Sequence, residues 1–334
     1  MHYLPKWLTM LTVGFNVGKG LNPRDTYVGS RMCVNIGKIS ARIEENSQQI
    51  NCLIQAPFKS PKQVIHCHNE FACLVALGFA FCGAVREQST YFFDDAVIDE
   101  RHGFFFVCDK YHQGENPTRL IPLPERLVSL LTQYRLQLRQ TSYELKEVFP
   151  NLARLLYSLY QPTRQPSDAN IHYQTGQPLL GLIVEGKWQA VSSDMIVKFL
   201  GNDFTLPVNF TRHLTCSNLP PSLTRYRQHL LGHNSVGHHV LDDMALNVNW
   251  LNSPDIKHQL NAMLDGLGIQ EVHAQSLRGA YALVRLPPQA LYYPDGYTQR
   301  ETRQREVFTF AKKHFLALLD RCESAEELEL QLPQ

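Results

Sequence analysis

The feature that most constrains this chain is an apolar stretch from His66 to Val85, of which residues 71–85 read FACLVALGFAFCGAV. The stretch is much longer than a typical strand of about four to eight residues. Its length favours a helix, and its composition favours burial of that helix. We therefore predict a buried helix here, with the positive charge of Arg86 at its end.

Short aromatic and β-branched segments follow this helix and are typical of strands. They are Thr90–Phe93, Gly103–Asp109 and Arg119–Pro124, with the sequence VIDERHG as a polar turn between the first two. We predict that the three segments form a small antiparallel three-stranded sheet.

Helical periodicity dominates most of the remaining chain. Between Pro124 and Tyr160 the apolar residues on one predicted helical side are Leu127, Leu130, Leu131, Tyr134 and Leu138. The further predicted elements are helices at Ser192–Leu200, from Phe210, at Ser222–Leu231 and at Arg300–Cys322, an amphipathic segment at Ile256–Leu267, and a strand-like piece at Tyr281–Tyr293. The predicted fold class is α+β and mainly helical.

Composition is that of an ordinary soluble globular protein, with 44% hydrophobic and 19% charged residues in a chain of 334. A net charge of +1 neither indicates nor excludes a nucleic-acid partner. The eight cysteines form no C-x-x-C pair, which argues against a zinc ribbon or a thioredoxin motif. Without a signal peptide or a run of about 18 apolar residues, we expect a cytoplasmic protein with reduced cysteines and no membrane partner.

Four basic residues lie near the ends of predicted elements. Arg86 ends the buried helix, Lys110 follows the GFFFVCD strand, Arg212 lies near the start of a helix, and His233 follows a Leu-Gly pair. Brought together, two arginines, a lysine and a histidine would bind a phosphodiester and stabilise its pentavalent transition state. The sequence therefore predicts a phosphate-binding site.

In this order the chain resembles the catalytic domain of the tyrosine recombinase, or phage integrase, family over roughly residues 65–245. The matching motifs are Gly83-Ala84-Val85-Arg86, the R-x-x-P-L-P strand Arg119–Pro124, the His-x-x-Arg-His box at 209–213, and Leu231-Gly232-His233. The resemblance implies that the domain has the recombinase catalytic fold, in which a small antiparallel sheet follows a buried helix.

The resemblance also implies roles for these residues. Arg86 and Arg212 would hold the scissile phosphate, Lys110 would protonate the leaving 5′ oxygen, and His233 would donate a hydrogen bond to a non-bridging oxygen. In the family a tyrosine then attacks the phosphate and forms a 3′-phosphotyrosine link with DNA.

Two residues depart from the family pattern. Asn209 stands where the family has histidine, and it can donate a hydrogen bond but cannot shuttle protons. Asp242 stands at the expected position of the tyrosine, and no tyrosine occurs between His233 and Arg278. An aspartate attacking a DNA diester would form a high-energy acyl phosphate, and its charge would repel the backbone. We therefore expect a site that binds phosphate without cleaving DNA.

We predict a protein that binds double-stranded DNA and acts as an accessory or regulatory factor in site-specific recombination or in a mobile element. A recombinase partner or self-association is also expected. One alternative is an active recombinase with a displaced nucleophile, for which Tyr281, Tyr292, Tyr293 and Tyr297 are the candidates. Another alternative is a scaffold that keeps only the fold and does not bind DNA.

No cofactor or metal is predicted. The group His229, His233, His238, His239 and Asp242 has metal-ligating residue types, but Gly232 would interrupt the helical spacing of its first two members. Simpler roles also remain open for the basic residues. Arg86 could be a cation at a helix end, Lys110 could be solvated, and His213 could support the fold.

The resemblance divides the chain into three predicted segments. Residues 1–61 are an N-terminal arm or a reduced core-binding lobe, residues 62–250 are the recombinase-like catalytic domain, and residues 251–334 are a C-terminal extension. Family members carry a larger helical core-binding domain that closes a clamp around DNA. Residues 1–61 do not resemble that helical bundle, so we expect a reduced clamp or one completed by another chain.

Overall fold

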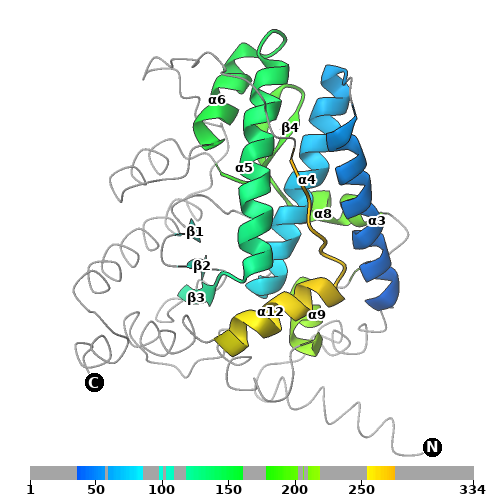
Figure 1. The fold of residues 1–334 in the computed structure, drawn as a ribbon, viewed down its shortest axis with the longest axis vertical. Coiled ribbons are helices and arrows are strands. Elements are labelled where there is room, and N and C mark those ends of the chain that lie inside the picture. The colour runs from blue at the N-terminus through cyan, green and yellow to red at the C-terminus, as the bar shows by residue number, and fades with distance from the viewer. Residues whose placement is uncertain are drawn as a thin grey trace, which may run out of the picture.

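The computed structural model describes residues 36–56, 59–85, 98–100, 103–108, 118–160, 178–201, 206, 210–218 and 254–274. The elements in these ranges are α3 (Ile36–Gln55), α4 (Pro61–Cys82), β1 (Ile98–Asp99), β2 (Phe104–Cys108), β3 (Thr118–Pro122), α5 (Glu125–Leu145), α6 (Pro150–Tyr160), β4 (Gly181–Val184), β5 (Lys187–Ala190), α8 (Ser193–Leu200), α9 (Phe210–Asn218) and α12 (Pro254–Gly266). Figure 1 shows that they are mainly helices with small antiparallel sheets, which confirms the predicted mainly helical α+β class.

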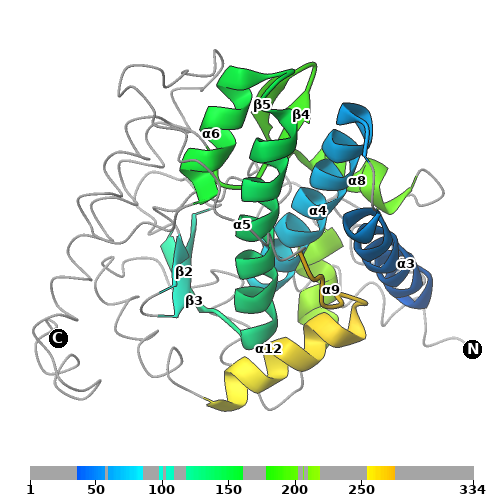
Figure 2. The ribbon, with the colours of Figure 1, turned by 45° about the horizontal axis from the view of Figure 1, so that its top comes forward.

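Helix α4 lies at the centre of the described fold. Figures 1 and 2 both show α3 on one side of it, α5 on the other and α12 across its lower end. Every residue from Phe71 to Cys82 is buried, so α4 is enclosed on all sides, as a helix that is apolar around its whole circumference must be. By length and composition α4 could cross a membrane, but 78% of its apolar window is buried inside the protein.

The predicted buried helix is confirmed, but it begins earlier than the apolar stretch. Pro61 is its first residue, whereas the hydrophobic pattern begins at His66. Ser60 accepts a hydrogen bond from the Gln63 backbone N–H, and the Gln63 side chain accepts one from the Ser60 backbone N–H at 2.9 Å. This capping box, with proline in the first turn, fixes the start of the helix.

The sequence leaves the segment Asp25–Glu45 open between a short strand and a helix, and the structure shows helix α3 from Ile36. Its buried isoleucines recur at a helical spacing, and they are Ile39, Ile43, Ile50 and Ile54. This stripe packs on α4 and α8. The spacing is visible in the sequence, but mostly polar and charged residues separate its members, so the segment lacks the continuous apolar character that identified α4.

The first sheet has the strand order β1-β2-β3, and both of its pairs are antiparallel. The prediction of a polar turn at residues 97–103 is wrong at its start. Ile98 and Asp99 form the first strand there and pair with Phe105 and Phe104 of β2. Ile98 is only 5% exposed, and its burial explains the pairing. The predicted strand Thr90–Phe93 lies outside the described residues.

A second hairpin, β4-β5, was also not predicted. Three aromatic side chains hold the chain at its start. His68 from α4, Tyr134 from α5 and Trp188 from β5 are each hydrogen-bonded to a carbonyl oxygen within residues 178–181, at 3.1, 3.2 and 2.9 Å. The imidazole lies between the other two rings, with centroid separations of 5.7 and 5.4 Å. This hairpin therefore belongs to the core around α4.

Helices α5 and α6 form a hairpin beside α4 (Figure 1). The predicted apolar side of α5 is confirmed, since all five of its residues are buried. The predictions of helices at Ser192–Leu200 and from Phe210, and of the amphipathic segment near Ile256, correspond to α8, α9 and α12. The predicted elements at Ser222–Leu231, Tyr281–Tyr293 and Arg300–Cys322 lie outside the described residues.

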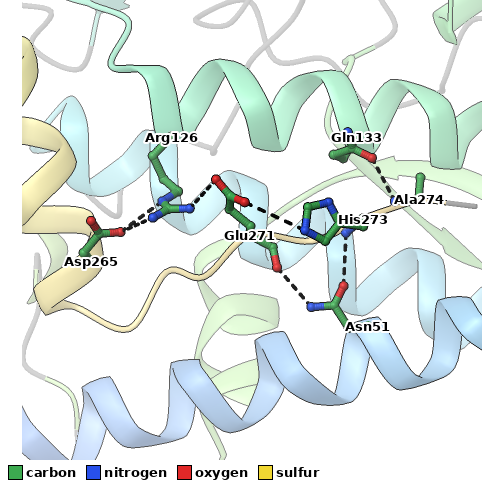
Figure 3. Close-up of polar contacts among 7 residues, drawn as sticks. All are labelled: Asn51, Arg126, Gln133, Asp265, Glu271, His273 and Ala274. Carbon is green, nitrogen blue, oxygen red and sulfur yellow. Dashed lines mark hydrogen bonds and ion pairs between the residues drawn. The ribbon is translucent and has the colours of Figure 1, made fainter.

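Residues 267–274, which we call the strap, run from the end of α12 between α3 and α5 (Figure 3). The Asn51 side chain donates to the Glu271 carbonyl oxygen and accepts from the His273 backbone N–H, both at 3.0 Å. Gln133 of α5 accepts from the Ala274 N–H at 2.9 Å. The strap therefore joins the first described helix to α5.

An arginine of α5 fixes both ends of the turn that leads into the strap. Arg126 contacts Asp265 of α12 at 2.7 Å and Glu271 of the strap at 2.8 Å (Figure 3). Helices α3 and α12 thus share one core with α4 and α5, although they come from the segments 1–61 and 251–334. The domain boundaries themselves stay a prediction.

The turn into the strap generates the first test. Gly268 has φ +82°, and a Cβ atom there would lie 2.2 Å from the Ser40 carbonyl oxygen. We expect Gly268→Ala to lower the free energy of unfolding by at least about 2 kcal/mol, because it adds left-handed strain and a backbone clash. Gly266→Ala is the matched control, because nothing lies within 4 Å of its Cβ position. The control should stay within about 1 kcal/mol of wild type in urea unfolding, and equal effects of the two variants would contradict this account.

Burial of His68 predicts a loss of stability in acid. Desolvation lowers the pKa of this imidazole to about 4. Its hydrogen bond to Gly181 acts in the opposite direction and raises the pKa, but by less. Below pH 6.5 the unfolded chain therefore takes up a proton that the folded chain does not. The free energy of unfolding should fall between pH 6.5 and pH 4, by up to about 3 kcal/mol from this group. His68→Gln should remove that part of the fall, whereas His66→Gln, at an exposed position two residues away, should keep it.

Candidate functional site

The C-terminal end of α4 carries the first predicted arginine motif, and its backbone forms a Schellman turn. The N–H of Val85 donates to the Ala80 carbonyl oxygen at 3.0 Å, and the N–H of Ala84 donates to that of Phe81 at 3.2 Å. Ala84 has φ +44°, the left-handed conformation that this motif requires after the helix. The chain therefore leaves α4 in a direction fixed by backbone bonds.

The left-handed residue in such a turn is usually glycine, but here the glycine comes one position earlier. A Cβ atom on Gly83 would lie 2.8 Å from the Val107 side chain of β2. Close packing of the sheet on the helix end thus requires glycine at this position. Ala84 then adopts the left-handed conformation, which costs about 1–2 kcal/mol for a residue with a Cβ atom.

Helix α9, which carries the second predicted arginine box, packs against this end of α4 (Figure 2). The Thr211 hydroxyl donates to the Val85 carbonyl oxygen at 3.0 Å, and the Thr215 hydroxyl donates to that of Phe81 at 2.6 Å. Both threonines are fully buried. Helix α9 thus gives the Phe81 carbonyl oxygen a second donor beside the Ala84 N–H, and it gives a donor to the Val85 carbonyl oxygen just beyond the helix.

The Arg212 guanidinium lies in the same contact. Its Nη1 is 3.5 Å from the Ala84 carbonyl oxygen, at the long limit of a hydrogen bond, and the residue is only 7% exposed. A cation is favourable next to the negative end of a helix dipole. The structure therefore brings Arg212 onto the turn that leads directly into Arg86, across 128 positions of sequence.

The other predicted site residues lie outside the described residues: Arg86, Lys110, Asn209, His233 and Asp242, and the candidate nucleophiles Tyr281, Tyr292, Tyr293 and Tyr297. Three of them are neighbours of described elements in the chain. Arg86 follows Val85, Asn209 precedes α9, and Lys110 belongs to the connection between the paired strands β2 and β3.

One predicted detail needs correction. We expected Arg86 to end the buried helix, but α4 ends at Cys82 and the Schellman turn occupies Gly83–Val85. Arg86 is therefore four positions beyond the last residue of α4 in the chain.

The sequence interpretation missed Thr211 and Thr215. They are four residues apart and so share one face of α9. Nothing in the sequence distinguishes them from other threonines, because their partners are backbone carbonyl groups of a distant helix.

The cysteines of α4 are structural. Cys67, Cys73 and Cys82 are free and buried, and desolvation raises the pKa of all three thiols, that of Cys67 to about 11. Thiols of this kind are poor nucleophiles and poor metal ligands. Among the residues that the structure describes, no group of three or more His, Cys, Asp or Glu side chains could hold a metal ion. The predicted histidine cluster at 229–242 lies outside those residues.

Comparison of the chain with protein families, with curated proteins and with solved structures found no match.

The Schellman turn predicts opposite effects for two adjacent substitutions. Ala84→Gly should raise the free energy of unfolding by about 1 kcal/mol, because glycine adopts the left-handed conformation without strain. Gly83→Ala should lower it by about 1–3 kcal/mol, because the new methyl group overlaps Val107. Equilibrium unfolding in urea measures both. Destabilisation by Ala84→Gly would contradict the assignment of the turn.

Proposed function

We propose that this chain is a DNA-binding protein of the tyrosine recombinase type, which holds duplex DNA by its backbone phosphate and does not cut it. One observation carries the proposal. The second arginine box, in α9, is hydrogen-bonded through Thr211 and Arg212 to the turn Gly83–Val85 of the first arginine motif. A family phosphate site needs these two segments together, although they are far apart in the sequence.

The order of the elements also supports a recombinase-type fold. A buried helix ends at the first motif, an antiparallel sheet follows, and the R-x-x-P-L-P segment leads from β3 into α5. Helix α9 then returns to the end of α4. The first part of this order, a buried helix followed by a small antiparallel sheet, is what the resemblance implies.

Two arginines at one site suit a phosphate diester. A guanidinium stays charged at every physiological pH and presents paired N–H donors to phosphate oxygens. Arg212 is anchored at the end of α4, and Arg86 is the first residue after the turn that anchors it. We infer that the two guanidinium groups bind one backbone phosphate.

The absence of a tyrosine between His233 and Arg278 supports binding without cleavage. Asp242 stands at the nucleophile position, and a carboxylate there would form an unstable acyl phosphate. A protein with such a site would act as an accessory or regulatory factor in recombination or in a mobile element, and would work beside a recombinase or a second copy of itself.

Salt-dependent DNA binding tests the proposal. The chain should bind duplex DNA taken from its own genomic neighbourhood at low salt, and affinity should fall linearly with salt on a log–log scale. Arg86→Ala should weaken binding by roughly tenfold and reduce the slope by about one, because one phosphate contact is lost. Arg154→Ala is the control, because Arg154 lies in α6, far from the proposed site. Helix α12 crosses the end of α4 that carries this site, and α6 lies at the opposite end of α5 from α12 (Figure 1).

Two results would count against the proposal. Absence of binding at low salt, or equal weakening by Arg154→Ala, would remove the phosphate site at the end of α4. A covalent protein–DNA adduct on a nicked suicide duplex would instead favour an active recombinase whose tyrosine is supplied from another position.

A further inference from the structure

We propose that helices α3 and α5 form a binding site for an extended peptide of another protein, and that the strap occupies this site in the free chain. The polar side chains that hold the strap, which we call the strap site, are Asn51 of α3 and Arg126 and Gln133 of α5. The partner segment would carry an aliphatic residue, any residue, an acidic residue and a second aliphatic residue in that order, as residues 269–272 do. The proposal does not depend on DNA binding, because the strap site shares no residue with the proposed phosphate site.

The strap site contacts main-chain atoms of the strap. The Asn51 amide donates to the Glu271 carbonyl oxygen and accepts from the His273 N–H, both at 3.0 Å, so it spans the residue between them (Figure 3). Gln133 accepts from the Ala274 N–H at 2.9 Å. When a peptide adds to the edge of a sheet, such main-chain bonds give affinity and side-chain contacts give specificity. Two side-chain amides take the part of the neighbouring strand here.

The side chains of the strap show which peptide the site would select. Ile269 and Val272 are buried, at 0% and 1% exposure, and Glu271 between them is exposed. The Glu271 carboxylate contacts the Arg126 guanidinium at 2.8 Å (Figure 3). Two aliphatic residues three positions apart would therefore anchor a partner segment. The charge of Arg126 would favour an acidic residue directly before the second of them and disfavour a basic one.

The two halves of the strap are held differently. The N–H groups of Gly268 and Ile269 donate to carbonyl oxygens of α12, both at 3.0 Å. Within the part of the chain that the structure describes, no backbone–backbone hydrogen bond involves residues 270–274. The carboxylate of Glu271 is 51% exposed, and exposed ion pairs contribute little to stability. The second half of the strap can therefore leave the strap site while the first half stays in place.

The fixed first half argues against a second copy of this chain as the occupant. A Cβ atom on Gly268 would lie 2.2 Å from the Ser40 carbonyl oxygen, and the Ser40 hydroxyl donates to the Gly266 carbonyl oxygen at 3.0 Å. The strap of one copy could reach the site of another only if these contacts with α3 broke. A segment of a different protein has no such constraint.

The experiment measures binding of a dye-labelled peptide with the sequence of residues 267–274 to the full chain by fluorescence anisotropy. In the wild-type chain the strap is present at a high effective concentration and excludes the free peptide. Val272→Ser removes an apolar anchor of the strap and leaves the strap site unchanged, and circular dichroism checks that this variant is folded. We expect the peptide to bind Val272→Ser at least about tenfold more tightly than it binds wild type.

Two further changes test whether the peptide uses the strap site. N-methylation of the peptide at the position of His273 removes the N–H that donates to Asn51, and it should weaken binding about tenfold. Asn51→Ala in the Val272→Ser background should have an effect of similar size. Asn151→Ala is the matched control, because Asn151 is an exposed asparagine of α6, and it should change the affinity by less than about twofold.

Three results would overturn the proposal. The first is equal peptide binding by wild type and folded Val272→Ser. The second is binding that neither N-methylation nor Asn51→Ala weakens. The third is a mixed dimer of wild type and Val272→Ser in size-exclusion chromatography, which would make a second copy the occupant.

Hydrogen exchange of the wild-type chain decides the matter if Val272→Ser does not fold. The amides of His273 and Ala274 should exchange through a local opening, much faster than those of Gly268, Ile269 and α4. Exchange of His273 and Ala274 only through global unfolding would overturn the proposal, because the strap site would then never be open to a partner.

Discussion

The fold depends on the complete burial of one helix. Helix α4 is apolar around its circumference from Phe71 to Cys82, so it has to be covered by α3, α5, α8, α9, α12 and the β4 strand. Burial extends to its C-terminal end, where carbonyl groups that would bond to water on an exposed helix need partners from the protein. The Schellman turn supplies some of these partners, and the hydroxyls of α9 supply others. The requirement that buries the helix thus also brings the two arginine segments together.

The sequence predicted the elements whose signal is local. The continuous apolar run identified α4, and the one-sided leucines identified α5. The capping box at Ser60 and the isoleucine stripe of α3 are weaker local signals, because prolines lie near the first and polar residues interrupt the second. The two-residue strand at Ile98 could not be predicted, since it forms only because β2 offers a pairing edge and the core buries its isoleucine.

For the candidate site, the sequence identified Arg212 but not its surroundings. Its contact with Ala84, and the bonds of Thr211 and Thr215, join residues more than 120 positions apart. A single sequence contains no signal for such pairs when one partner is a backbone carbonyl group. The placement of glycine at position 83 and alanine at position 84 follows from tertiary packing against Val107 in the same way. Helix α3 and the strap are also built into the core around α4.

A crystal structure of the chain bound to duplex DNA tests the central claim most directly. The quantity to measure is the separation of the Arg86 and Arg212 guanidinium groups and the phosphates that each contacts. The account predicts that both groups bind oxygens of one backbone phosphate, with Thr211 still bonded to Val85. DNA bound elsewhere on the protein, with Arg212 serving only the end of α4, would contradict it.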